Sequence, residues 1–495
     1  MDTVTLPLAI PFDNSYARLP QNFFARIQPE PVRAPQLIHI NDELARFLNI
    51  DPVPLHSKEG AEVFAGNRIA EGSEPLALAY AGHQFGNFVP QLGDGRACLL
   101  GEVIAQDFNR YDIQLKGSGP TPFSRRGDGR AALGPVLREY LVSEAMHALG
   151  VPTTRALAAV LTGEAVVREE MLPGAVLTRV AGSHLRVGTF EYFAAREDKD
   201  GVRTLADYAI GRHYRAAAQQ PKRYRALLEG VIARQAKLVA QWMGLGFIHG
   251  VMNTDNTSIS GETLDYGPCA FMEAYDPGTV FSAIDQRGRY AYGNQPGIMT
   301  WNVSRLAETL LPLMADEEGS SEAALAAAYE VLNGFAPLYE AEYLRVFRAK
   351  LGLTQEHQED AALVKDLLDV MTLGHADFTL TFRHLSEEDG SGAREQFIST
   401  AAFDAWLTRW QTRLAAENSS EGKRTQSMQR TNPVYIPRNH LVQEAIDAAV
   451  LRQDFSPFEQ LLQVVTSPFQ EQAARHRYAT PAKPEQRVMQ TFCGT

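Results

Sequence analysis

The apolar pattern of this chain changes from strand-like to helix-like partway along its length, and that change limits its possible folds more than any other feature. From Leu76 to about residue 190, short apolar runs alternate with glycines and turns. The runs ACLLGEVI (97–104) and YDIQL (111–115), joined by the polar stretch AQDFNR, predict two adjacent antiparallel strands. TRALAAVLTGEAVVRE (154–169) and GAVLTRVA (174–181) predict further strands.

Helical spacing interrupts this part once and then dominates the second half. Segment 135–149, PVLREYLVSEAMHAL, carries apolar residues at helical spacing and has Pro135 near its start. Residues 222–243 have the same spacing, and Gly244 and Gly246 are expected to stop that helix. We expect further helices at about 302–314, 321–351, 360–373 and 401–416, and solvated loops at 386–395 and 417–427.

Strands followed by helices predict an α+β fold with two lobes. We divide the chain into an extended, proline-containing N-terminal arm packing on the core (1–75), a β-rich lobe (76–190), a mainly helical lobe (191–430) and a C-terminal extension (431–495). The first lobe and the start of the second carry the candidate chemistry.

Charge and cysteine content exclude several classes of protein. Lys and Arg number 47 against 59 Asp and Glu, a formal net charge of −12, which argues against a protein that coats nucleic acid or binds membranes through a basic surface. Three cysteines are too few for a disulfide framework. No apolar run approaches the roughly 20 residues of a membrane span, and the first residues lack a signal-peptide pattern. We expect a cytoplasmic monomer.

The segment FIHGVMNTDNTSISGETLDYGP (247–268) is the first candidate site. Amide and carboxylate oxygens are the ligands that Mg²⁺ accepts, and Asn256 and Asp265, at the two ends of an expected hairpin, can share one ion. Asp255 is then available as a base toward a hydroxyl. The alternative is that these residues only form turns.

Residues upstream complete the outline of a nucleotide site. Lys116, in the strand YDIQLK, is placed to contact phosphate, and Glu139, on the following helix, can pair with it, as in protein kinases. Gly93, Gly95 and Arg96 form a glycine-rich turn before the lysine strand. Each feature alone is weak, but their order along the chain favours a kinase-like site.

The chain departs from protein kinases at the catalytic base. Kinases place the base Asp directly after His-Arg, whereas here His249-Gly250 is followed by Val251, which cannot accept a proton. By the criteria used for protein kinases, the chain would therefore be classed as a pseudokinase. Asp255 is the only local carboxylate that could substitute.

Five long motifs together resemble the selenoprotein O family. They are YAGHQFGNFVPQLGDGRACLLGE (80–102), QLKGSGPTPFSRRGDGRAALGPVLREYL (114–141), LTRVAGSHLRVGTFEYF (177–193), GFIHGVMNTDNTSISGETLDYGP (246–268) and NPVYIPRNHLVQEAI (432–446). The resemblance covers most of the chain. It implies a two-lobed protein-kinase-like fold in which ATP binds in a flipped orientation, so that AMP rather than phosphate is transferred to Ser, Thr or Tyr hydroxyls of proteins, the enzyme itself included, with release of pyrophosphate.

The resemblance also implies roles for individual residues. Asp255 corresponds to the proton acceptor, and Asn256 and Asp265 to the ligands of Mg²⁺ or Mn²⁺. The residues implied in ATP binding are Gly93, Gly95, Arg96, Lys116, Asp128, Gly129, Arg179, Arg186 and Asp265.

A flipped ATP buries its β- and γ-phosphates, so more than one cation is needed beside them. Arg96, Arg179 and Arg186, together with Lys116, can supply these charges through guanidinium–phosphate contacts. Arg125, Arg126 and Arg130 can add to the same field, although surface ion pairing is the alternative role for such arginines.

Two cysteines suggest redox control. Cys493, near the chain end, matches the site where some members of the selenoprotein O family carry selenocysteine, and Cys269 directly follows the motif that contains Asp265. We hypothesise a reversible Cys269–Cys493 disulfide that changes activity; two unrelated free thiols are the alternative. Two other functions also stay open, an ordinary kinase that passes on the γ-phosphoryl group and a non-catalytic, nucleotide-binding redox scaffold.

Overall fold

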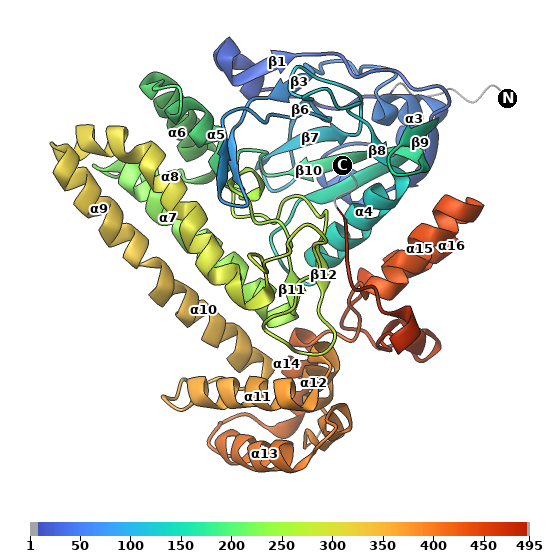
Figure 1. Ribbon diagram of the computed structural model, residues 1–495, viewed down its shortest axis with the longest axis vertical. Coiled ribbons are helices and arrows are strands. Elements are labelled where there is room, and N and C mark those ends of the chain that lie inside the picture. Colours follow the sequence, from blue (N-terminus) through green and yellow to red (C-terminus); the bar gives the residue numbers. More distant parts are fainter. Residues whose placement is uncertain (1–7, 388, 493–495) are drawn as a thin grey trace.

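The computed structural model describes residues 8–387 and 389–492. A sheet-rich N-terminal part is followed by a helical C-terminal part (Figure 1). The predicted mixed α+β architecture is therefore confirmed. No helix in the described ranges is both long enough and apolar enough to span a membrane.

One antiparallel sheet organises the first part. Within the described residues it has eight strands, in the order β1-β3-β6-β7-β10-β9-β2, with β8 pairing to β10. The strands of this sheet are β1 (Phe24–Arg26), β2 (Gln36–Ile40), β3 (Leu76–Leu78), β6 (Ala97–Ile104), β7 (Arg110–Lys116), β8 (Ala131–Ala132), β9 (Arg155–Val167) and β10 (Met171–Ala181). The predicted pairing of β6 with β7 is confirmed, and its register sets Lys116 opposite Ala97. On the other side of β7, Lys116 faces Leu177 of β10.

Two short hairpins lie outside this sheet. The first consists of β4 (Gly82–Gln84) and β5 (Asn87–Val89), and the second of β11 (Phe247–Ile248) and β12 (Ala270–Phe271). The second hairpin brackets the 247–268 motif.

The first 75 residues are more ordered than an extended arm. They supply β1 and β2, which end the sheet on opposite sides, and three short helices. The helices are α1 (Asp42–Phe47), α2 (Pro52–Leu55) and α3 (Lys58–Ala65). Apolar residues of α1 and α3, among them Leu44 and Phe64, pack in one core with Leu115 of β7. This segment is therefore part of the sheet's own core.

Helix α4 (Leu133–Ala148) covers the sheet on its other side, as the sequence predicted. Leu137, Leu141 and Ala145, spaced four residues apart, are fully buried. They share a core with α15 (Asn439–Arg452) and α16 (Ser456–Val465), which lie beside α4 in Figure 1. The C-terminal extension thus packs against the helix that carries Glu139.

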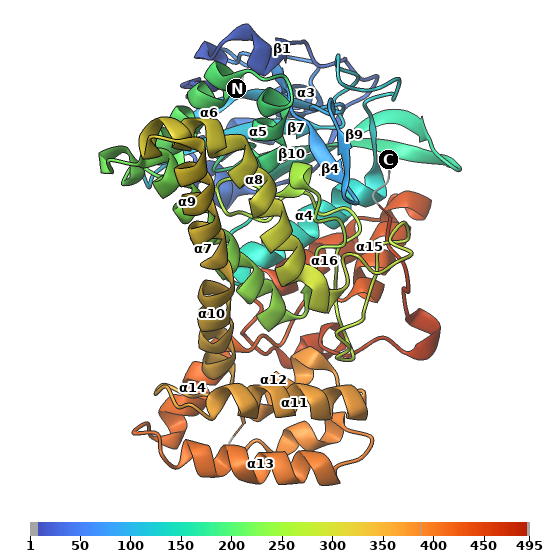
Figure 2. The same ribbon diagram turned by 60° about the vertical axis from the view of Figure 1, so that its left-hand side comes forward.

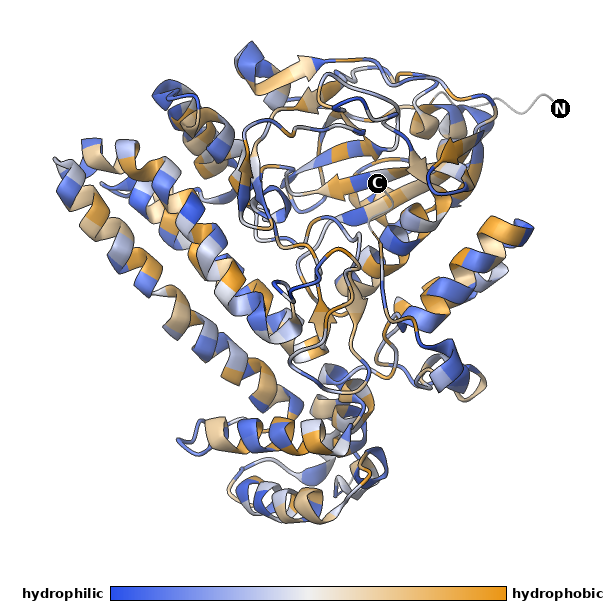
Figure 3. Ribbon diagram, viewed as in Figure 1, coloured by the Kyte–Doolittle hydropathy of each residue, from blue (hydrophilic) through white to orange (hydrophobic). Residues whose placement is uncertain are grey.

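The remaining helices build the second part. They are α5 (Val187–Ala194), α6 (Lys199–His213), α7 (Arg223–Leu245), α8 (Gln295–Glu318), α9 (Ser321–Asn333), α10 (Phe335–Lys350), α11 (Asp360–Gly374), α12 (Phe378–Leu385), α13 (Ala401–Leu414) and α14 (Glu421–Thr431). In Figures 1 and 2, α7, α8, α9 and α10 run lengthwise and α11–α14 form the end of the molecule away from the sheet. Apolar and polar residues alternate along the long helices (Figure 3).

Three expectations about this part were wrong in detail. Helix α7 continues through Gly244 and ends at Gly246, whose φ of +69° is the left-handed cap. A Cβ on Gly244 would lie 2.3 Å from Val346 Cγ1, so this glycine permits close contact of α7 with α10 rather than stopping the helix. The single helix expected at 321–351 is two helices that divide at Gly334. The loop expected at 417–427 contains the start of α14.

Lys350, the last residue of α10, is buried against the aromatic rings of α12. Its exposed fraction is 3%, and its Nζ lies 4.3 Å from the ring centroid of Phe382 and 5.5 Å from that of Phe378. Burial lowers the pKa of Lys350 to about 7. A lysine with so low a pKa is largely neutral just above neutral pH. In the unfolded chain the same lysine would still be protonated there, and the loss of this proton on folding lowers the stability of the folded state.

Replacing this lysine by methionine should stabilise the protein in a pH-dependent way. The pKa of Lys350 is lower in the folded than in the unfolded state, so the unfolded state binds more protons at this site between about pH 7 and 10.5. Each unit of pKa difference corresponds to about 1.4 kcal/mol. We expect Lys350→Met to raise the free energy of unfolding near pH 7.5, with a gain that shrinks toward pH 10.

Denaturant unfolding of wild type and variant at several pH values would measure this difference. Lys237→Met, at an exposed position of α7, is the control and should show no such trend. A Lys350→Met variant that is less stable than wild type at pH 7.5 would contradict the argument and would show that the ammonium–ring contacts dominate.

Candidate active site

Four charged side chains, three of them buried and Asp265 partly exposed, meet where the sheet, α4 and the 247–268 motif come together. Lys116 Nζ, at the end of β7, lies 2.7 Å from Glu139 Oε2 and 2.7 Å from Asp265 Oδ1. Arg179, on the neighbouring strand β10, donates through Nε to Glu139 and through Nη2 to Asp265 Oδ1 at 2.9 Å. Two cations and two carboxylates thus form one closed network, which we call the Lys116 cluster.

The cluster keeps both of its carboxylates ionised. Burial acts to raise the pKa of Asp265, but Lys116 and Arg179 hold it well below its ordinary value. Burial likewise opposes ionisation of Glu139, and Arg179 and Lys116 reverse that effect and lower its pKa. Asp265 is therefore a permanent anion, as a metal-binding or charge-positioning residue must be.

The backbone around Asp265 is held in an uncommon conformation. Asp265 has a φ of +71°, in the left-handed region that few non-glycine residues adopt. His249 Nε2 lies 3.0 Å from the carbonyl oxygen of the preceding Leu264, and the His249 amide donates to Gln295 Oε1 at 3.0 Å. Burial lowers the pKa of His249, which favours a neutral ring in this position. His249 therefore supports the loop that presents Asp265.

Asp255 has an environment opposite to that of Asp265. It lies in the turn Thr254–Asn256, where Gln84 Nε2 donates to its Oδ2 at 3.3 Å. Its Oδ1 is buried and has no hydrogen-bond partner within the ranges the structure describes. Burial raises the pKa of Asp255 to about 6, although Arg186 acts to lower it. A buried carboxylate with a raised pKa and an unused oxygen is suited to accept a proton.

Asp255, Asn256 and Asp265 line one cavity of about 600 Å³. Val251 lines it too, at the position where protein kinases carry their base. Asn256 Nδ2 donates to the Val251 carbonyl at 3.1 Å, which leaves the amide oxygen of Asn256 available for a cation. Within the described chain, no three His, Cys, Asp or Glu side chains group as metal ligands. The two oxygen donors fit Mg²⁺ if phosphate and water complete its coordination.

A second cavity, of about 490 Å³, adjoins the first. It is lined by the glycine turn Gly93 and Gly95, by Asp128 and Gly129, and by Tyr80. Three further residues line both cavities: Arg96, Arg125 and Arg168. A nucleotide of extended shape can therefore reach from one cavity into the other past these guanidinium groups.

Arg186 lies behind the second cavity. Its guanidinium carbon is 4.0 Å from the ring centroid of Tyr80, and its Nη2 is 3.9 Å from Asp94 Oδ1. The chain thus brings the predicted Arg96, Arg179 and Arg186 to one region, with Arg179 in the Lys116 cluster and Arg186 beside the cavity wall.

Two of the predicted glycines are required by close packing. A Cβ on Gly93 would lie 2.3 Å from the Phe123 ring, and one on Gly129 would lie 2.1 Å from Gly119 backbone atoms. Both residues also have positive φ, +72° and +66°. Larger residues here would push the 119–129 segment away from the glycine turn and change the second cavity.

The other arginines near the second cavity have different surroundings. Arg130 Nη2 pairs with Glu30 Oε2 at 3.0 Å, the surface ion pair that was its alternative role. Arg168, which sequence reasoning missed, pairs with Asp128 Oδ2 at 2.8 Å and lies beside the turn between β9 and β10. Arg125 and Arg126 are exposed and have positive φ of +49° and +73°, so their loop is held in an unusual conformation.

Cys269 is buried, and burial raises the pKa of its thiol to about 12. Cys493 lies outside the described residues, so the predicted disulfide stays a prediction. The last described residues do pass close to Cys269: Thr491 Oγ1 donates to the Pro268 carbonyl at 2.6 Å, and the Thr491 amide donates to the Phe281 carbonyl at 2.8 Å.

Sequence reasoning missed Gln84 and Phe85 as well, both of which line the cavity with Asp255. The motif AGHQFG that contains them carried a signal, since its polar residues interrupt an apolar stretch, but nothing in it indicated a partner 171 residues away.

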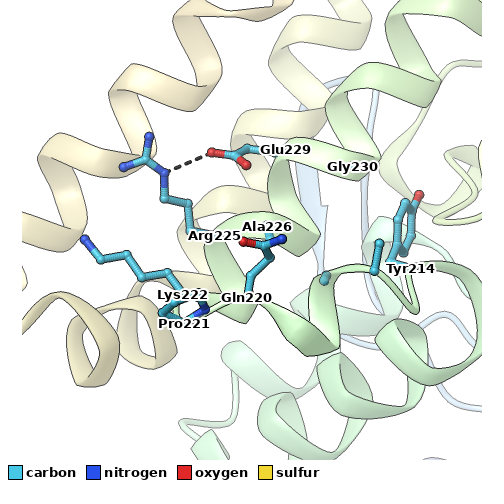
Figure 4. A pocket seen from close by; sticks show the side chains of 10 residues that line it. Tyr214, Gln220, Pro221, Lys222, Arg225, Ala226, Glu229 and Gly230 are labelled. Atoms are coloured by element: carbon cyan, nitrogen blue, oxygen red, sulfur yellow. Dashed lines mark hydrogen bonds and ion pairs between the residues drawn. The ribbon is translucent and has the colours of Figure 1, made fainter.

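A separate cavity of about 690 Å³ lies at the start of α7, away from these residues (Figure 4). Its charged side chains form ion pairs with one another or with carboxylates of neighbouring helices. Arg225 Nε donates to Glu229 Oε1 at 2.9 Å and its Nη2 lies 3.1 Å from Glu330, while Lys222 pairs with Glu318. With no unpaired titratable group shown among its lining residues, it is a weaker candidate for catalysis than the cavity that contains Asp255.

Comparison with known proteins identifies the family of the chain. A family model described as protein adenylyltransferase SelO matches residues 7–466. The chain is 60% identical over 490 residues to a protein nucleotidyltransferase YdiU of Rhodopseudomonas palustris strain HaA2, covering 98% of this chain and 99% of the relative. It is 61% identical to a protein of that name from Methylorubrum populi and 62% identical to one from R. palustris strain BisB5, each with the same coverage. The family model covers the residues of the Lys116 cluster, and the chain belongs to the SelO family.

Proposed function

We propose that this protein is a protein adenylyltransferase, which transfers AMP from ATP to Ser, Thr or Tyr hydroxyls of proteins, itself included, and releases pyrophosphate. Membership of the SelO family and the protein nucleotidyltransferase names of its relatives support the activity. The observation that carries the proposal is the cavity that Asp255, Asn256 and Asp265 line together. It combines a proton acceptor, two cation ligands and several guanidinium groups.

We propose a protein-kinase-like division into lobes, with the sheet and α4 as a nucleotide-binding lobe (76–190) and the helical part as a catalytic lobe (191–430). The contacts of Lys116 with Glu139 and with Asp265 support this division, because they join strand, helix and D-x-G motif as kinases do. The first 75 residues then contribute β1, β2 and α1–α3 to this lobe, and residues 431–495 are an extension that packs on it. We also propose a cytoplasmic monomer.

Cations placed along the two cavities suit the phosphates of ATP. Lys116 and Arg179 lie beside Asp265 Oδ1, so both would be close to the phosphates of a nucleotide whose metal ion Asp265 holds. Arg96 lines both cavities, and Arg186 lies at the wall of the second, where Gly93, Gly95, Asp128 and Gly129 complete the lining. Guanidinium groups bind phosphate oxygens in pairs, so this set can neutralise a buried triphosphate end.

Asn256 and Asp265 would hold Mg²⁺ or Mn²⁺, with phosphate oxygens as further ligands. The ion, when bound, would offset charge that develops on the departing pyrophosphate. The ionised state of Asp265, fixed by the Lys116 cluster, suits it to this role.

Asp255 would act on the acceptor. The acceptor hydroxyl oxygen forms a bond to the α-phosphorus while the bond from that phosphorus to the bridging oxygen of the β-phosphate breaks. The hydroxyl proton passes to the carboxylate of Asp255, and pyrophosphate leaves with the electron pair of the broken bond. Because transition states of this type are loose, orientation of the hydroxyl by Asp255 contributes alongside proton transfer.

Two other functions remain as alternatives. An ordinary kinase would use the same lysine and cation but transfer the γ-phosphoryl group, and Val251 at the kinase base position disfavours it. A nucleotide-binding scaffold whose redox state is set by a Cys269–Cys493 disulfide would need no Asp255. We retain that disulfide as a proposed regulator of the enzyme.

Label transfer from ATP distinguishes these functions. We expect radiolabel at the α-phosphate, and none at the γ-phosphate, to appear on the protein itself and on proteins of a cell extract, with a mass increase corresponding to AMP. Asp265→Ala should abolish the transfer, whereas Asp276→Ala, at an exposed aspartate of the following segment, should leave it unchanged. Transfer of only the γ-label would establish a kinase and contradict the proposal.

Asp255→Asn should lower kcat by about 10²- to 10⁴-fold, the usual contribution of a positioned acid or base. The isosteric amide preserves shape but cannot accept the proton, so the dissociation constant for ATP with Mg²⁺ should change little. Steady-state AMP transfer and calorimetric ATP binding measure the two effects separately, with Asp276→Asn as control. An unchanged kcat would remove Asp255 from the mechanism.

Asn256→Ala should weaken divalent-ion binding independently of turnover. Electron paramagnetic resonance of Mn²⁺, titrated into the protein with a non-hydrolysable ATP analogue, reports bound ion directly. We expect the affinity for Mn²⁺ to fall at least about tenfold, in keeping with the loss of one of two protein ligands. Unchanged Mn²⁺ affinity would contradict the assignment of Asn256 as a ligand.

A further inference from the structure

The hairpin formed by β4 and β5, residues 82–89, lies against the segment that carries Asp255. Three consecutive hairpin residues contact three consecutive residues of that segment. The His83 amide donates to Thr254 Oγ1 at 2.7 Å, Gln84 Nε2 donates to Asp255 Oδ2 at 3.3 Å, and the Phe85 amide donates to Asn253 Oδ1 at 3.1 Å. Figure 2 shows β4 reaching from the sheet toward these loops.

Glu191 of α5 contacts both the hairpin and the segment that carries Asp255. Its Oε1 lies 2.5 Å from His83 Nδ1, and its Oε2 accepts a hydrogen bond from Thr254 Oγ1 at 2.5 Å. The base of the hairpin is joined to the same helix, because the Ala81 amide donates to the Gly188 carbonyl at 2.9 Å. Helix α5 thus holds the hairpin and the Asp255 segment in one fixed relation.

Gly82 lets the hairpin approach the carboxyl group closely. A Cβ at this position would lie 2.6 Å from Asp255 Oδ1 and 2.9 Å from its Cβ, which is closer than side chains tolerate. The absence of a side chain on Gly82 therefore creates the space that Asp255 occupies. The hairpin both shapes this space and supplies a side-chain donor to the carboxylate.

The two oxygens of Asp255 consequently differ. Oδ2 accepts from Gln84, whereas Oδ1 is buried without a hydrogen-bond partner among the described residues. Because Oδ1 lies against Gly82 and Oδ2 is held by Gln84, the carboxyl group points in one defined direction. Fixing that direction before the acceptor arrives is the kind of positioning that lowers an activation barrier.

We propose that Gln84 is a positioning residue for catalysis, and that the 82–89 hairpin holds the carboxyl group of Asp255 in the orientation that the acceptor hydroxyl requires. This inference rests on the proposed role of Asp255 and explains the AGHQFG motif, whose histidine, glutamine and first glycine each contact the Asp255 segment or leave room for it. Gln84 exchanges no proton with substrate; it acts through Asp255.

Three variants test this role. Gln84→Ala removes the side chain, Gln84→Glu keeps its shape but replaces the donor by an acceptor, and Gly82→Ala places a methyl group against the carboxyl. We expect each to lower kcat for AMP transfer by about 10- to 100-fold, the cost of displacing a reacting group by about an ångström. In the two Gln84 variants, KM for ATP and the melting temperature should stay near their wild-type values; Gly82→Ala introduces a steric clash and is judged by kcat and KM alone.

Asn87→Ala is the matched control. Asn87 is exposed on β5 of the same hairpin and pairs with Gln84 only through the strand register. Its kcat should stay within about twofold of wild type, as for most surface substitutions. Gln84→Glu separates hydrogen bonding from packing, because full activity in this variant would mean that shape alone matters.

The outcomes separate this inference from the proposed function. Wild type that transfers AMP, with Gln84→Ala and Gln84→Glu as active as wild type, overturns the role of Gln84 and leaves the function in place. A fall in kcat of the Gln84 variants accompanied by an equal rise in KM for ATP or by a lowered melting temperature also overturns it, since a merely structural residue would behave so. Wild type that transfers no AMP refutes the proposed function and this inference with it.

Discussion

The contact of Lys116 and Arg179 with Asp265 is the interaction on which the rest of the site depends. Lys116 Nζ and Arg179 Nη2 approach the same oxygen, at 2.7 and 2.9 Å, from adjacent strands of the sheet. Glu139 of α4 holds both cations from the other side. Removing any one member would leave an uncompensated charge in a buried place, which costs several kcal/mol. The sheet, α4 and the loop after β11 are therefore fixed relative to one another by charge as well as by packing.

Two aspartates of one short segment obtain opposite properties from this arrangement. Asp265 faces two cations and has a pKa well below its ordinary value, whereas Asp255 is buried beside a single amide donor and has a pKa raised to about 6. Environments that push the pKa values of two carboxyl groups apart assign them different roles. The permanent anion suits cation binding, and the weaker acid suits exchange of a proton with a hydroxyl. Val251 occupies the position at which a kinase has its base. Asp255, four residues later, supplies the carboxylate in its place.

The sequence predicted those parts of the fold that depend on local pattern and chain order. The strands around Lys116 and helix α4 follow from period-2 and period-3.6 spacing of apolar residues, and the order of glycine turn, lysine, glutamate and aspartates indicated the site. Long-range packing was not predictable in this way. Gly244 has the composition of a helix stop, yet it lies inside α7 because Val346 of α10 packs against it. Helix α14 buries only Met428, so its sequence resembles a solvated loop. The contact between Gln84 and Asp255 joins residues 171 positions apart, and no local pattern reports such a pairing.

The difference between the two carboxyl groups also explains what a hairpin outside the main sheet does at this place. Asp265 is directed by two cations and by its own backbone, which has a positive φ supported through His249. Asp255 has no cation in hydrogen-bonding contact within the described structure, and a buried carboxylate without a partner would lose orientation or ionisation. A cation beside it would restore the orientation but would lower its pKa and weaken it as a base. A neutral amide donor such as that of Gln84 orients the carboxylate at a smaller cost in basicity. An uncharged polar residue on a rigid hairpin is therefore the physical solution that keeps Asp255 both directed and basic.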